Sequence, residues 1–374
     1  MLDNDIDEQN TSLPKVYGHS GALEDLLRKV GDPEINDLED VLQFRKDYAG
    51  VRQKKVDDSI AQVKVHISEM LAEMNRLKLE KEELIKSKSE ELNQTITRLH
   101  GELTLPDREC NFVTGMYRKI KRWAQNRKIG YFKNNFQKIL DGVTKDSRNR
   151  IESLENKIKF TENNLQRVAE ENISSELRRL NEINNTLENE KYLIYGAIGE
   201  TDVINELRKL PKTYHVINDL RAQFNPPIYN RSENDRIYSI QVDSLVVGPT
   251  GLFVIETKYW SKRSISSETL FSPVKQVKRA GFALFVRLNG AAKSGRITGM
   301  VNNWGERKIS LRQIVASVND VPHAEFQYVK VLGIEKLNSY ITYGKEEFTS
   351  EQIQEIVDYL IQSNTPSRPW ARSG

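Results

Sequence analysis

The stretch QVDSLVVGPTGLFVIETKYW, residues 241–260, places three charged side chains at the ends of two apolar runs. Both runs are rich in β-branched residues and predict strands. The Gly-Pro-Thr-Gly sequence at 248–251 is typical of a turn, so we expect an antiparallel hairpin. Because side chains alternate across a strand, Glu256 and Lys258 share one face, and Asp243 joins them if the register suits.

Two carboxylates and a lysine in this order favour metal-dependent phosphodiester hydrolysis. Buried carboxylates repel each other unless a cation lies between them, and Mg²⁺ takes oxygen ligands and bridges to phosphate. Asp243 and Glu256 are therefore candidate ligands for Mg²⁺, with Mn²⁺ as a substitute. Lys258 is a candidate for orienting or deprotonating the attacking water and for stabilising transition-state charge. A structural ion pair at a strand end produces the same Glu-x-Lys pattern and stays an alternative.

Upstream of the hairpin, residues 195–200 lead into a predicted amphipathic helix. Its apolar residues recur at helical spacing, at Val203, Ile204, Leu207 and Leu210. Pro211 ends this helix, and residues 214–219 then predict a further strand.

In these segments the chain resembles the NERD (nuclease-related domain) family of the PD-(D/E)xK superfamily. The motifs that carry the resemblance are G-A-x-G-E at 196–200, V-I-N-D at 216–219, Q-x-D-x-L-V-V-G-P-x-G at 241–251 and F-V-I-E-T-K-Y-W at 253–260. The similarity continues weakly over 273–276 and extends to a predicted strand at 328–334 and a helix at 350–361. It covers roughly residues 192–363, about half of the chain.

The resemblance implies a restriction-endonuclease-like α/β domain, with a mixed sheet flanked by helices. It also implies that Glu200 is a further catalytic residue, as a metal ligand or as a group that orients water. Gln276 would steady the substrate or the lysine. Ser244 departs from the His that the family favours after the Asp, which affects only the surroundings of the site. Taken alone, Glu200 also fits an acidic residue in the first turn of a helix.

Basic residues follow the hairpin. Between Lys258 and Arg312 there are twelve Lys or Arg and only two acidic residues. Phosphate contacts supply most nonspecific affinity for nucleic acid, so this segment favours a polyanionic substrate over a merely solvated surface. The candidate nucleic-acid-binding residues are Lys262, Arg263, Lys275, Lys278 and Arg279.

The composition indicates more than one domain. The chain has 374 residues, is 29% charged and carries a formal net charge of +3. A single cysteine, Cys110, excludes an internal disulfide and a cysteine-based zinc site. No apolar run is long enough to span a membrane and no apolar signal core begins the chain, so we expect a cytoplasmic protein without membrane association.

The first 40 residues are acidic, with eleven Asp or Glu against three Lys or Arg. We predict a helical N-terminal segment over 1–50, with short helices at 23–30 and 35–44. Such a segment could mimic a polyanion and block the basic face of the nuclease-like domain. A flexible tail or a small helical cap explains the same composition.

Residues 51–192 predict a coiled-coil arm, because apolar residues recur at near-heptad spacing in two polar stretches. The first stripe comprises Ile60, Val63, Ile67, Met70, Met74, Leu77 and Leu84 and, after a one-residue slip, Leu92, Ile96, Leu99 and Leu103. The second comprises Ile151, Leu154, Ile158, Leu165, Val168, Leu177, Leu180 and Leu187. The matching lengths favour an antiparallel hairpin, but pairing between chains, and hence a homo-oligomer, produces the same pattern.

The predicted tip of this arm, residues 106–142, combines basic and aromatic residues. The basic residues are Arg108, Arg118, Lys119, Lys121, Arg122, Arg127, Lys128, Lys133 and Lys138. The aromatic ones are Phe112, Tyr117, Trp123, Tyr131, Phe132 and Phe136. Three explanations stay open at this point: the core of a small helical domain, a nucleic-acid contact, or a docking surface for a protein partner.

The domain organisation that we predict ends with a nuclease-like domain at 193–363 and a tail at 364–374. The function that it favours is a Mg²⁺-dependent DNA endonuclease, less readily an exonuclease, with RNA left open as a substrate. By family analogy alone, this activity suits bacterial DNA processing or anti-phage defence. The alternative is a coiled-coil assembly or adaptor protein whose nuclease-like domain only binds nucleic acid.

Overall fold

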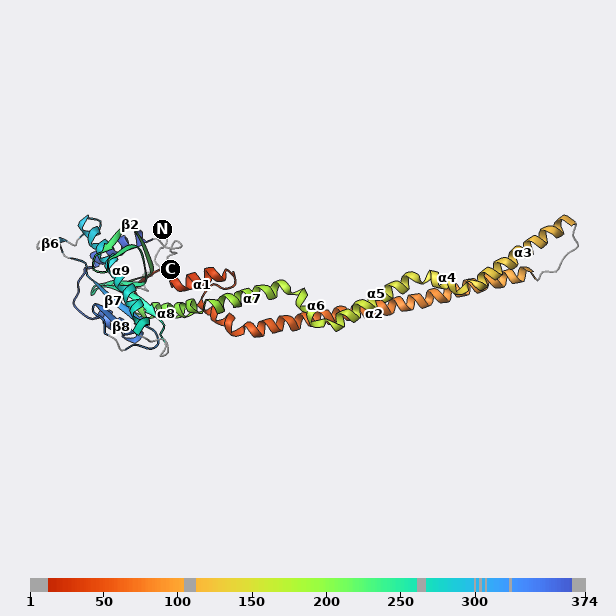
Figure 1. Ribbon diagram of the computed structural model, residues 1–374, viewed down its shortest axis with the longest axis horizontal. Helices are drawn as coiled ribbons and strands as arrows, with labels where there is room; N and C mark the ends of the chain where they lie inside the picture. Colours follow the sequence, from red (N-terminus) through yellow and green to blue (C-terminus); the bar gives the residue numbers. More distant parts are fainter. Residues whose placement is uncertain are drawn as a thin grey trace, which may run out of the picture. The chain divides into compact units, whose positions relative to one another are not determined.

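The computed structural model describes residues 13–103, 112–260, 267–298, 301–302, 305–306, 308–322 and 325–364. The chain forms two compact units. The first unit combines residues 1–46 with residues 182–374, and the second comprises residues 47–181. Figure 1 shows the order of the elements along the chain.

A six-stranded mixed sheet forms the centre of the first unit, in the order β1-β2-β3-β4-β7-β8. Its strands are β1 (Lys15–Tyr17), β2 (His215–Asn230), β3 (Asp235–Gly248), β4 (Gly251–Lys258), β7 (Leu311–Ser317) and β8 (Val329–Gly333). Strands β2, β3 and β4 pair antiparallel, whereas β1 lies parallel to β2, and β4, β7 and β8 run parallel to one another. A separate two-stranded ribbon joins β5 (Val301–Asn302) to β6 (Gly305–Glu306).

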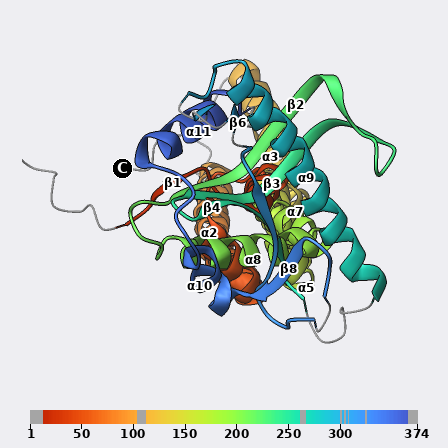
Figure 2. The ribbon, with the colours of Figure 1, turned by 90° about the vertical axis from the view of Figure 1, so that its left-hand side faces the viewer.

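Helices cover both faces of this sheet (Figure 2). One face packs against α9 (Ser267–Lys293) and α11 (Ser350–Gln362), through a cluster that includes Val254 and Leu284. The other face packs against α8 (Lys191–Leu207) and α10 (Leu337–Thr342), through a cluster that includes Phe253. A 3-10 turn, η1 (Ile334–Lys336), precedes α10. The mixed sheet flanked by helices that the sequence predicts is confirmed.

The N-terminal residues belong to this α/β unit. Strand β1 extends the sheet at the edge of β2, and α1 (Gly21–Val30) packs beside α8 through a cluster that includes Leu26 and Ile194. The structure therefore divides the chain differently from the predicted separate segment at 1–50, because backbone pairing of β1 and apolar packing of α1 bind these two elements to the sheet domain. The predicted boundary at 192 likewise falls inside helix α8. Of the predicted tail, Asn364 is described and residues 365–374 lie outside the described residues.

The second unit is an antiparallel pairing of helices within one chain. Helix α2 (Leu38–Leu103) runs in one direction, and a series of shorter helices returns alongside it. These are α3 (Phe112–Asn134), α4 (Phe136–Val143), α5 (Lys145–Asn163), α6 (Leu165–Asn172) and α7 (Ser174–Asn189). Hydrogen bonds and ion pairs show that the two paths are antiparallel. As the residue number on α2 increases, the residue number of its partner on the returning helices decreases. The pairs are Tyr48–Asn181, Lys55–Glu176, Lys78–Glu155 and Glu102–Gln125. Among the described residues, the hairpin alternative is the one that the structure contains.

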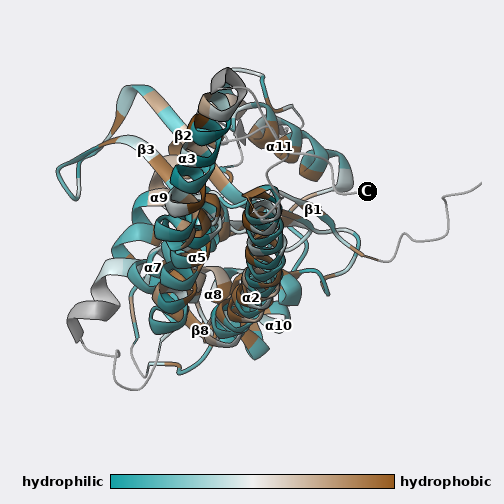
Figure 3. Cartoon of the chain, turned by 90° about the vertical axis from the view of Figure 1, so that its right-hand side faces the viewer, coloured by the Kyte–Doolittle hydropathy of each residue, from teal (hydrophilic) through white to brown (hydrophobic). Residues whose placement is uncertain are grey.

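Apolar side chains of the predicted stripes meet between α2 and the returning helices. Val63, Ile67, Met70 and Met74 are buried against Ile151 and Ile158. Leu84, which lies where the heptad repeat slips, is 39% exposed. Hydrophilic residues predominate along the outer surfaces of α2 and α5 (Figure 3). None of the helices in the described part of the chain is both long and apolar enough to cross a membrane.

Candidate active site

The candidate site lies where strands β3 and β4 stop pairing. The ladder runs from the turn to the pair Ser244–Ile255, so Asp243 and Glu256 are the next residues on the two strands. The Thr257 N–H donates a 2.7 Å hydrogen bond to Asp243 Oδ2. The Asp243 carboxylate thus takes the place of a backbone carbonyl as the acceptor for this N–H group. The hydrogen bond anchors the Asp243 side chain to β4.

Lys258 and Glu256 form an ion pair on β4, with Nζ and Oε1 2.7 Å apart. The two residues share the side of the strand that carries Leu252 and Val254, as the strand alternation predicts. Glu256 is only 7% exposed, whereas the Lys258 side chain is 32% exposed. The lysine therefore covers the buried carboxylate and keeps one side open to solvent.

Burial and mutual repulsion of the carboxylates dominate the electrostatics of the site. Burial raises the pKa of Asp243 well above its ordinary value, and the charges of Glu256 and Glu200 raise it further. Burial alone would lower the pKa of Lys258, but the charges of Glu256 and Asp243 raise it overall. Protons are thus favoured on both Asp243 and Lys258, and a cation near the carboxylates would reverse that preference at Asp243.

Glu200 reaches the site from α8, because this helix packs closely on β4. A Cβ at Gly199 would lie 3.4 Å from Thr257 Cγ2, an ordinary van der Waals distance, so this part of α8 lies directly against β4. Burial raises the pKa of Glu200, and the nearby charges of Asp219 and Glu256 add to the effect. Glu200 is therefore an electrostatic neighbour of the hairpin carboxylates, although the sequence separates them by more than 40 residues.

The start of helix α1 binds Glu200. Ser20 Oγ donates to Glu200 Oε2 at 2.7 Å, and the Ala22 N–H donates to the same oxygen at 3.1 Å. Ser20 is also the N-cap of α1, since its hydroxyl accepts from the Leu23 N–H at 3.1 Å. A carboxylate at a helix N-terminus gains from unsatisfied N–H groups and from the helix dipole. Sequence reasoning did not anticipate this contact.

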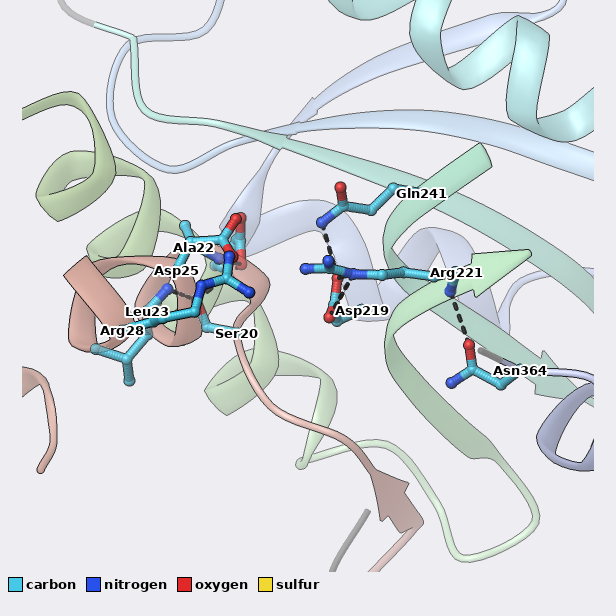
Figure 4. A network of polar contacts seen from close by, with 10 residues as sticks. Ser20, Ala22, Leu23, Asp25, Arg28, Asp219, Arg221, Gln241 and Asn364 are labelled. Carbon is cyan, nitrogen blue, oxygen red and sulfur yellow. Dashed lines mark hydrogen bonds and ion pairs between the residues drawn. The ribbon is translucent and has the colours of Figure 1, made fainter. Parts of the chain in front are cut away.

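Asp219 is a further acidic residue near the site, and no role was assigned to it from the sequence. Its carboxylate accepts from Arg221 Nε at 3.0 Å and from Gln241 Nε2 at 2.8 Å (Figure 4). Burial raises the pKa of Asp219, which also adopts a positive φ of 48°. A Cβ at Gly21 would lie 2.6 Å from Asp219 Oδ1, so α1 touches this residue as well. The motif V-I-N-D ends at Asp219 and was the signal that could have identified it.

Gln276 is an exposed residue of α9. Together with Arg221, Gln241 and Arg279 it lines a cavity of about 410 Å³ between α9 and strands β2 and β3. Within the described residues, no hydrogen bond joins Gln276 to Asp243, Glu256 or Lys258. The structure therefore places Gln276 at the same polar cavity as Gln241, the hydrogen-bond partner of Asp219, and two arginines also line this cavity.

The candidate nucleic-acid-binding residues have different surroundings. Lys275 is exposed and Lys278 is half-buried. Arg279 donates to Asp235 Oδ2 at 2.6 Å and to the Ser239 carbonyl at 3.0 Å, so part of its binding capacity is used to hold α9 against β3. Lys262 and Arg263 lie outside the described residues.

Ser244 has a structural partner. Its hydroxyl donates a 2.8 Å hydrogen bond to Asn218 Oδ1, and both residues are buried. This bond joins β2 to β3 one residue before Asp219 and one residue after Asp243. Ser244 thus fixes the relative position of the two strands that carry the acidic residues.

The carboxylate oxygens at the strand ends are of the type that Mg²⁺ prefers, but they are few. Within the described residues, no group of three or more His, Cys, Asp or Glu side chains is arranged to hold a metal ion. Mg²⁺ at phosphate-processing sites commonly takes only one or two carboxylates, with waters and substrate phosphate completing its coordination. Asp243 and Glu256, a partly buried pair whose charges interact, fit that requirement. Glu200 Oε2 instead accepts the two hydrogen bonds from α1.

Comparison with known protein families agrees with the position of this site. The family model described as the nuclease-related domain (NERD) matches residues 195–301. A search of curated proteins and a search of solved structures found no match. The matched segment contains α8 from residue 195 onward, the strands β2 to β4 and α9, and therefore all five predicted catalytic residues. Residues 195–301 thus match the nuclease-related domain, and they lie in a mixed sheet with flanking helices that is consistent with a restriction-endonuclease-like fold.

Proposed function

We propose that the nuclease-related domain is a Mg²⁺-dependent endonuclease that hydrolyses phosphodiester bonds of DNA. The observation that carries this proposal is the cluster of Asp243, Glu256 and Lys258 at the diverging ends of β3 and β4. An isolated structural ion pair would need only Glu256 and Lys258. The additional partly buried carboxylate raises the electrostatic cost of the site, which is typical of a functional cluster.

In this proposal Asp243 and Glu256 hold the metal ion. When bound, Mg²⁺ would polarise the phosphoryl oxygen and make a bound water more acidic. The Thr257 N–H keeps the Asp243 carboxylate oriented, through its bond to Oδ2. Glu256 Oε1 positions Lys258 Nζ at the partly open side of the site.

The protonation state of Lys258 decides which catalytic role we propose for it. Without a bound metal, the neighbouring carboxylates raise the pKa of Lys258 above the ordinary value of 10.5, so the amine is protonated at neutral pH. A protonated amine cannot take a proton from water, but it can donate to a phosphate oxygen and stabilise charge that develops there. Of the three roles predicted for Lys258, we therefore propose transition-state stabilisation, which is compatible with orienting the attacking water, and not deprotonation of that water.

Basic side chains beside the site support a polyanionic substrate. Lys275 is exposed on α9, and Arg221 and Arg279 line the neighbouring cavity with Gln276. Cationic groups near a phosphate-processing centre raise the local concentration of nucleic acid. The biological setting that the family analogy suggests, DNA processing or anti-phage defence, stays a prediction.

A plasmid assay tests the proposal. Supercoiled plasmid and a single-stranded DNA would be incubated with the full chain in Mg²⁺, Mn²⁺ or EDTA, beside Asp243→Ala and Lys258→Ala. We expect metal-dependent nicking or linearisation and a loss of at least about 100-fold in each variant. Lys336→Ala and Glu346→Ala, at exposed positions of the same unit, are controls for a general effect of charge removal. Equal cleavage by the wild type and both site variants would overturn the proposal.

A second candidate, a nucleic-acid-binding adaptor without hydrolytic activity, is favoured by one observation. Helix α1 binds the carboxylate of Glu200, the residue that the family resemblance assigns as a further metal ligand. If that contact is permanent, Glu200 does not join Asp243 and Glu256 as a third acidic ligand. Undiminished DNA binding with no cleavage under Mg²⁺ or Mn²⁺ would favour this adaptor.

A further inference from the structure

Helix α3, in the second unit, has two faces of different character. The first packs on α2: Ile129 is 5% exposed, and Gln125, 8% exposed, donates a 2.5 Å hydrogen bond to Glu102 of α2. Residues at positions 118, 122 and 132 follow the same heptad spacing and are half-buried. This face binds α3 to the hairpin.

The second face carries large apolar and aromatic side chains in solvent. Met116 is 59% exposed, Ile120 56%, Trp123 62% and Tyr131 59%. Their spacing of four, three and eight residues places them along one side of the helix, opposite the packed face. The aromatic side chains Tyr117, Trp123 and Tyr131 therefore do not form the core of a small domain, the first explanation of the tip, within the part of the chain that the structure describes.

Positive charge surrounds this exposed stripe. Helix α3 contains seven Lys or Arg and no Asp or Glu. Five of them are exposed, at Lys119, Lys121, Arg127, Lys128 and Lys133. Lys121 and Lys128 lie two turns apart on one flank, and Lys119 lies on the other. The Arg127 guanidinium lies 5.4 Å from the centre of the Trp123 ring.

We propose that this face of α3 (the α3 face: Met116, Tyr117, Ile120, Trp123, Arg127 and Tyr131, with the flanking lysines) binds single-stranded nucleic acid. The lysines and Arg127 would contact phosphates, and the rings of Tyr117, Trp123 and Tyr131 would stack on bases. Such a site is separate from the hairpin carboxylates and does not depend on hydrolysis. It would let the helical hairpin bind a strand independently of the nuclease-related domain.

The position of Arg127 distinguishes a nucleic acid from other partners. It lies four residues after Trp123 and four before Tyr131, in the middle of the apolar stripe. A lipid bilayer or an apolar protein surface would have to bury this guanidinium together with the stripe, which costs free energy. A second copy of α3 would place its own seven cationic side chains against the seven of the first copy, and the like charges would repel each other. A phosphate backbone instead pairs with Arg127 while the rings contact bases.

Fluorescence anisotropy in EDTA tests the proposal without cleavage. The probes are labelled oligothymidine and oligouridine strands and a DNA duplex, and the protein is the full chain carrying Asp243→Ala. We expect Trp123→Ala to weaken binding of both single strands about fivefold or more, the scale of one lost stacked base. Lys121→Gln with Lys128→Gln should reduce the slope of log affinity against log salt by about 1.4, since each phosphate contact contributes about 0.7.

The matched control lies on the same arm. Phe160 is 54% exposed on α5 and Lys159 beside it is exposed, so Phe160→Ala with Lys159→Gln removes one aromatic and one cation outside α3. This control should leave affinity and salt slope unchanged. A difference between the thymidine and uridine strands would identify which nucleic acid the α3 face prefers. The same affinity in wild type, Trp123→Ala and the double lysine variant would overturn the proposal.

Two parallel measurements test the two other possible partners of the α3 face, a lipid membrane and a second copy of the chain. If Trp123→Ala abolishes sedimentation with phosphatidylglycerol vesicles and leaves strand affinity intact, the α3 face is a membrane site and the proposal is wrong. If mass photometry shows a dimer that Trp123→Ala dissociates, with strand affinity intact, the face pairs two copies and the proposal is also wrong. Strand binding at α3 without any plasmid cleavage would leave this inference in place and remove the proposed nuclease function.

Discussion

Ser20 Oγ donates a 2.7 Å hydrogen bond to Glu200 Oε2 and so joins residues 180 positions apart in the sequence. The same hydroxyl caps helix α1 by accepting from the Leu23 N–H. One side chain therefore both starts a helix and fixes the carboxylate that the family resemblance places in the catalytic site. The consequences of this contact can be measured.

Ser20→Ala should destabilise the protein more than loss of an ordinary helix cap. It removes a cap worth about 1 kcal/mol and a hydrogen bond to a carboxylate worth about 1.5–3 kcal/mol. Thr349→Ala is the matched control, because Thr349 caps α11 through the Gln352 N–H without contacting a site carboxylate. Urea denaturation of both variants measures the difference. Equal losses would show that the bond to Glu200 contributes nothing to stability.

Gly21→Ala should disturb the contact between α1 and Asp219. The added Cβ would lie 2.6 Å from Asp219 Oδ1, so one of the two must shift, at a cost of about 1–3 kcal/mol. Gly50→Ala is the control: Gly50 lies inside α2, a Cβ there meets nothing within 4 Å, and alanine should stabilise the helix by about 0.5–1 kcal/mol. Thermal unfolding of both variants measures the two changes in stability. If both substitutions stabilise or both destabilise the protein, the prediction is wrong.

Asp243→Asn should stabilise the metal-free protein at neutral pH but not at acid pH. The folded protein holds the Asp243 proton more tightly than the unfolded chain, whose aspartates have a pKa near 3.8. The folded state therefore loses stability as the pH rises from 3.8 through the raised pKa, and asparagine removes that loss. We expect a gain of about 0.5–2 kcal/mol at pH 7, measured by denaturation in EDTA.

The acid measurement is the control for this effect. At about pH 3 and below, Asp243 is protonated in the folded state and largely so in the unfolded chain, so the advantage of asparagine should shrink. At neutral pH, Mg²⁺ should stabilise the wild type and leave Asp243→Asn unaffected, because only the wild type retains the carboxylate pair. A stability difference that does not change with pH would contradict the electrostatic origin.

Lys258→Met should destabilise the protein by about 1–2 kcal/mol, because Glu256 loses its partner while only 7% exposed. The partly exposed lysine keeps this cost below that of a fully buried pair. Lys258→Arg retains the charge and should restore stability, yet it should restore cleavage poorly if the amine contacts phosphate at a fixed position. Parallel denaturation and plasmid assays separate the two effects. Full activity in Lys258→Met would contradict the catalytic role.

Ile158→Ala should loosen the helical hairpin. Ile158 is 6% exposed and packs between α5 and α2 with Val63 and Ile67, so a loss of about 2–4 kcal/mol is expected. Leu84→Ala, at a site 39% exposed on α2, should cost far less. Far-ultraviolet circular dichroism during thermal unfolding measures both, and similar losses would contradict the intrachain packing.

Local periodicity accounts for what could be predicted of the fold. Strand alternation places Glu256 and Lys258 on one side of β4, and the heptad stripes identify the residues buried between α2 and α5. The strand at β8 and the helix at α11 were also expected, whereas β1 and β7 were not. Strand β1 has three residues, too few for a pattern of its own to emerge.

The candidate site could be predicted only in part, for a similar reason. Asp243, Glu256 and Lys258 lie on neighbouring strands joined by a short turn, so their proximity follows from the hairpin alone. Asp219 has its place because β2 pairs with β3, and its positive φ is a property of the folded chain. Gln276 was expected to steady the substrate or the lysine, and that role stays a prediction; its place at the cavity that Gln241 also lines depends on the packing of α9.

The sequence by itself determined the antiparallel hairpin of β3 and β4, the helical stripes and the charges, since these depend on neighbours a few residues apart. Tertiary structure decided three further matters. The start of α1 binds Glu200, the coiled coil closes within one chain, and the aromatic side of α3 faces solvent. Each depends on contacts between residues distant in the sequence, whose free energy exists only once the chain has folded.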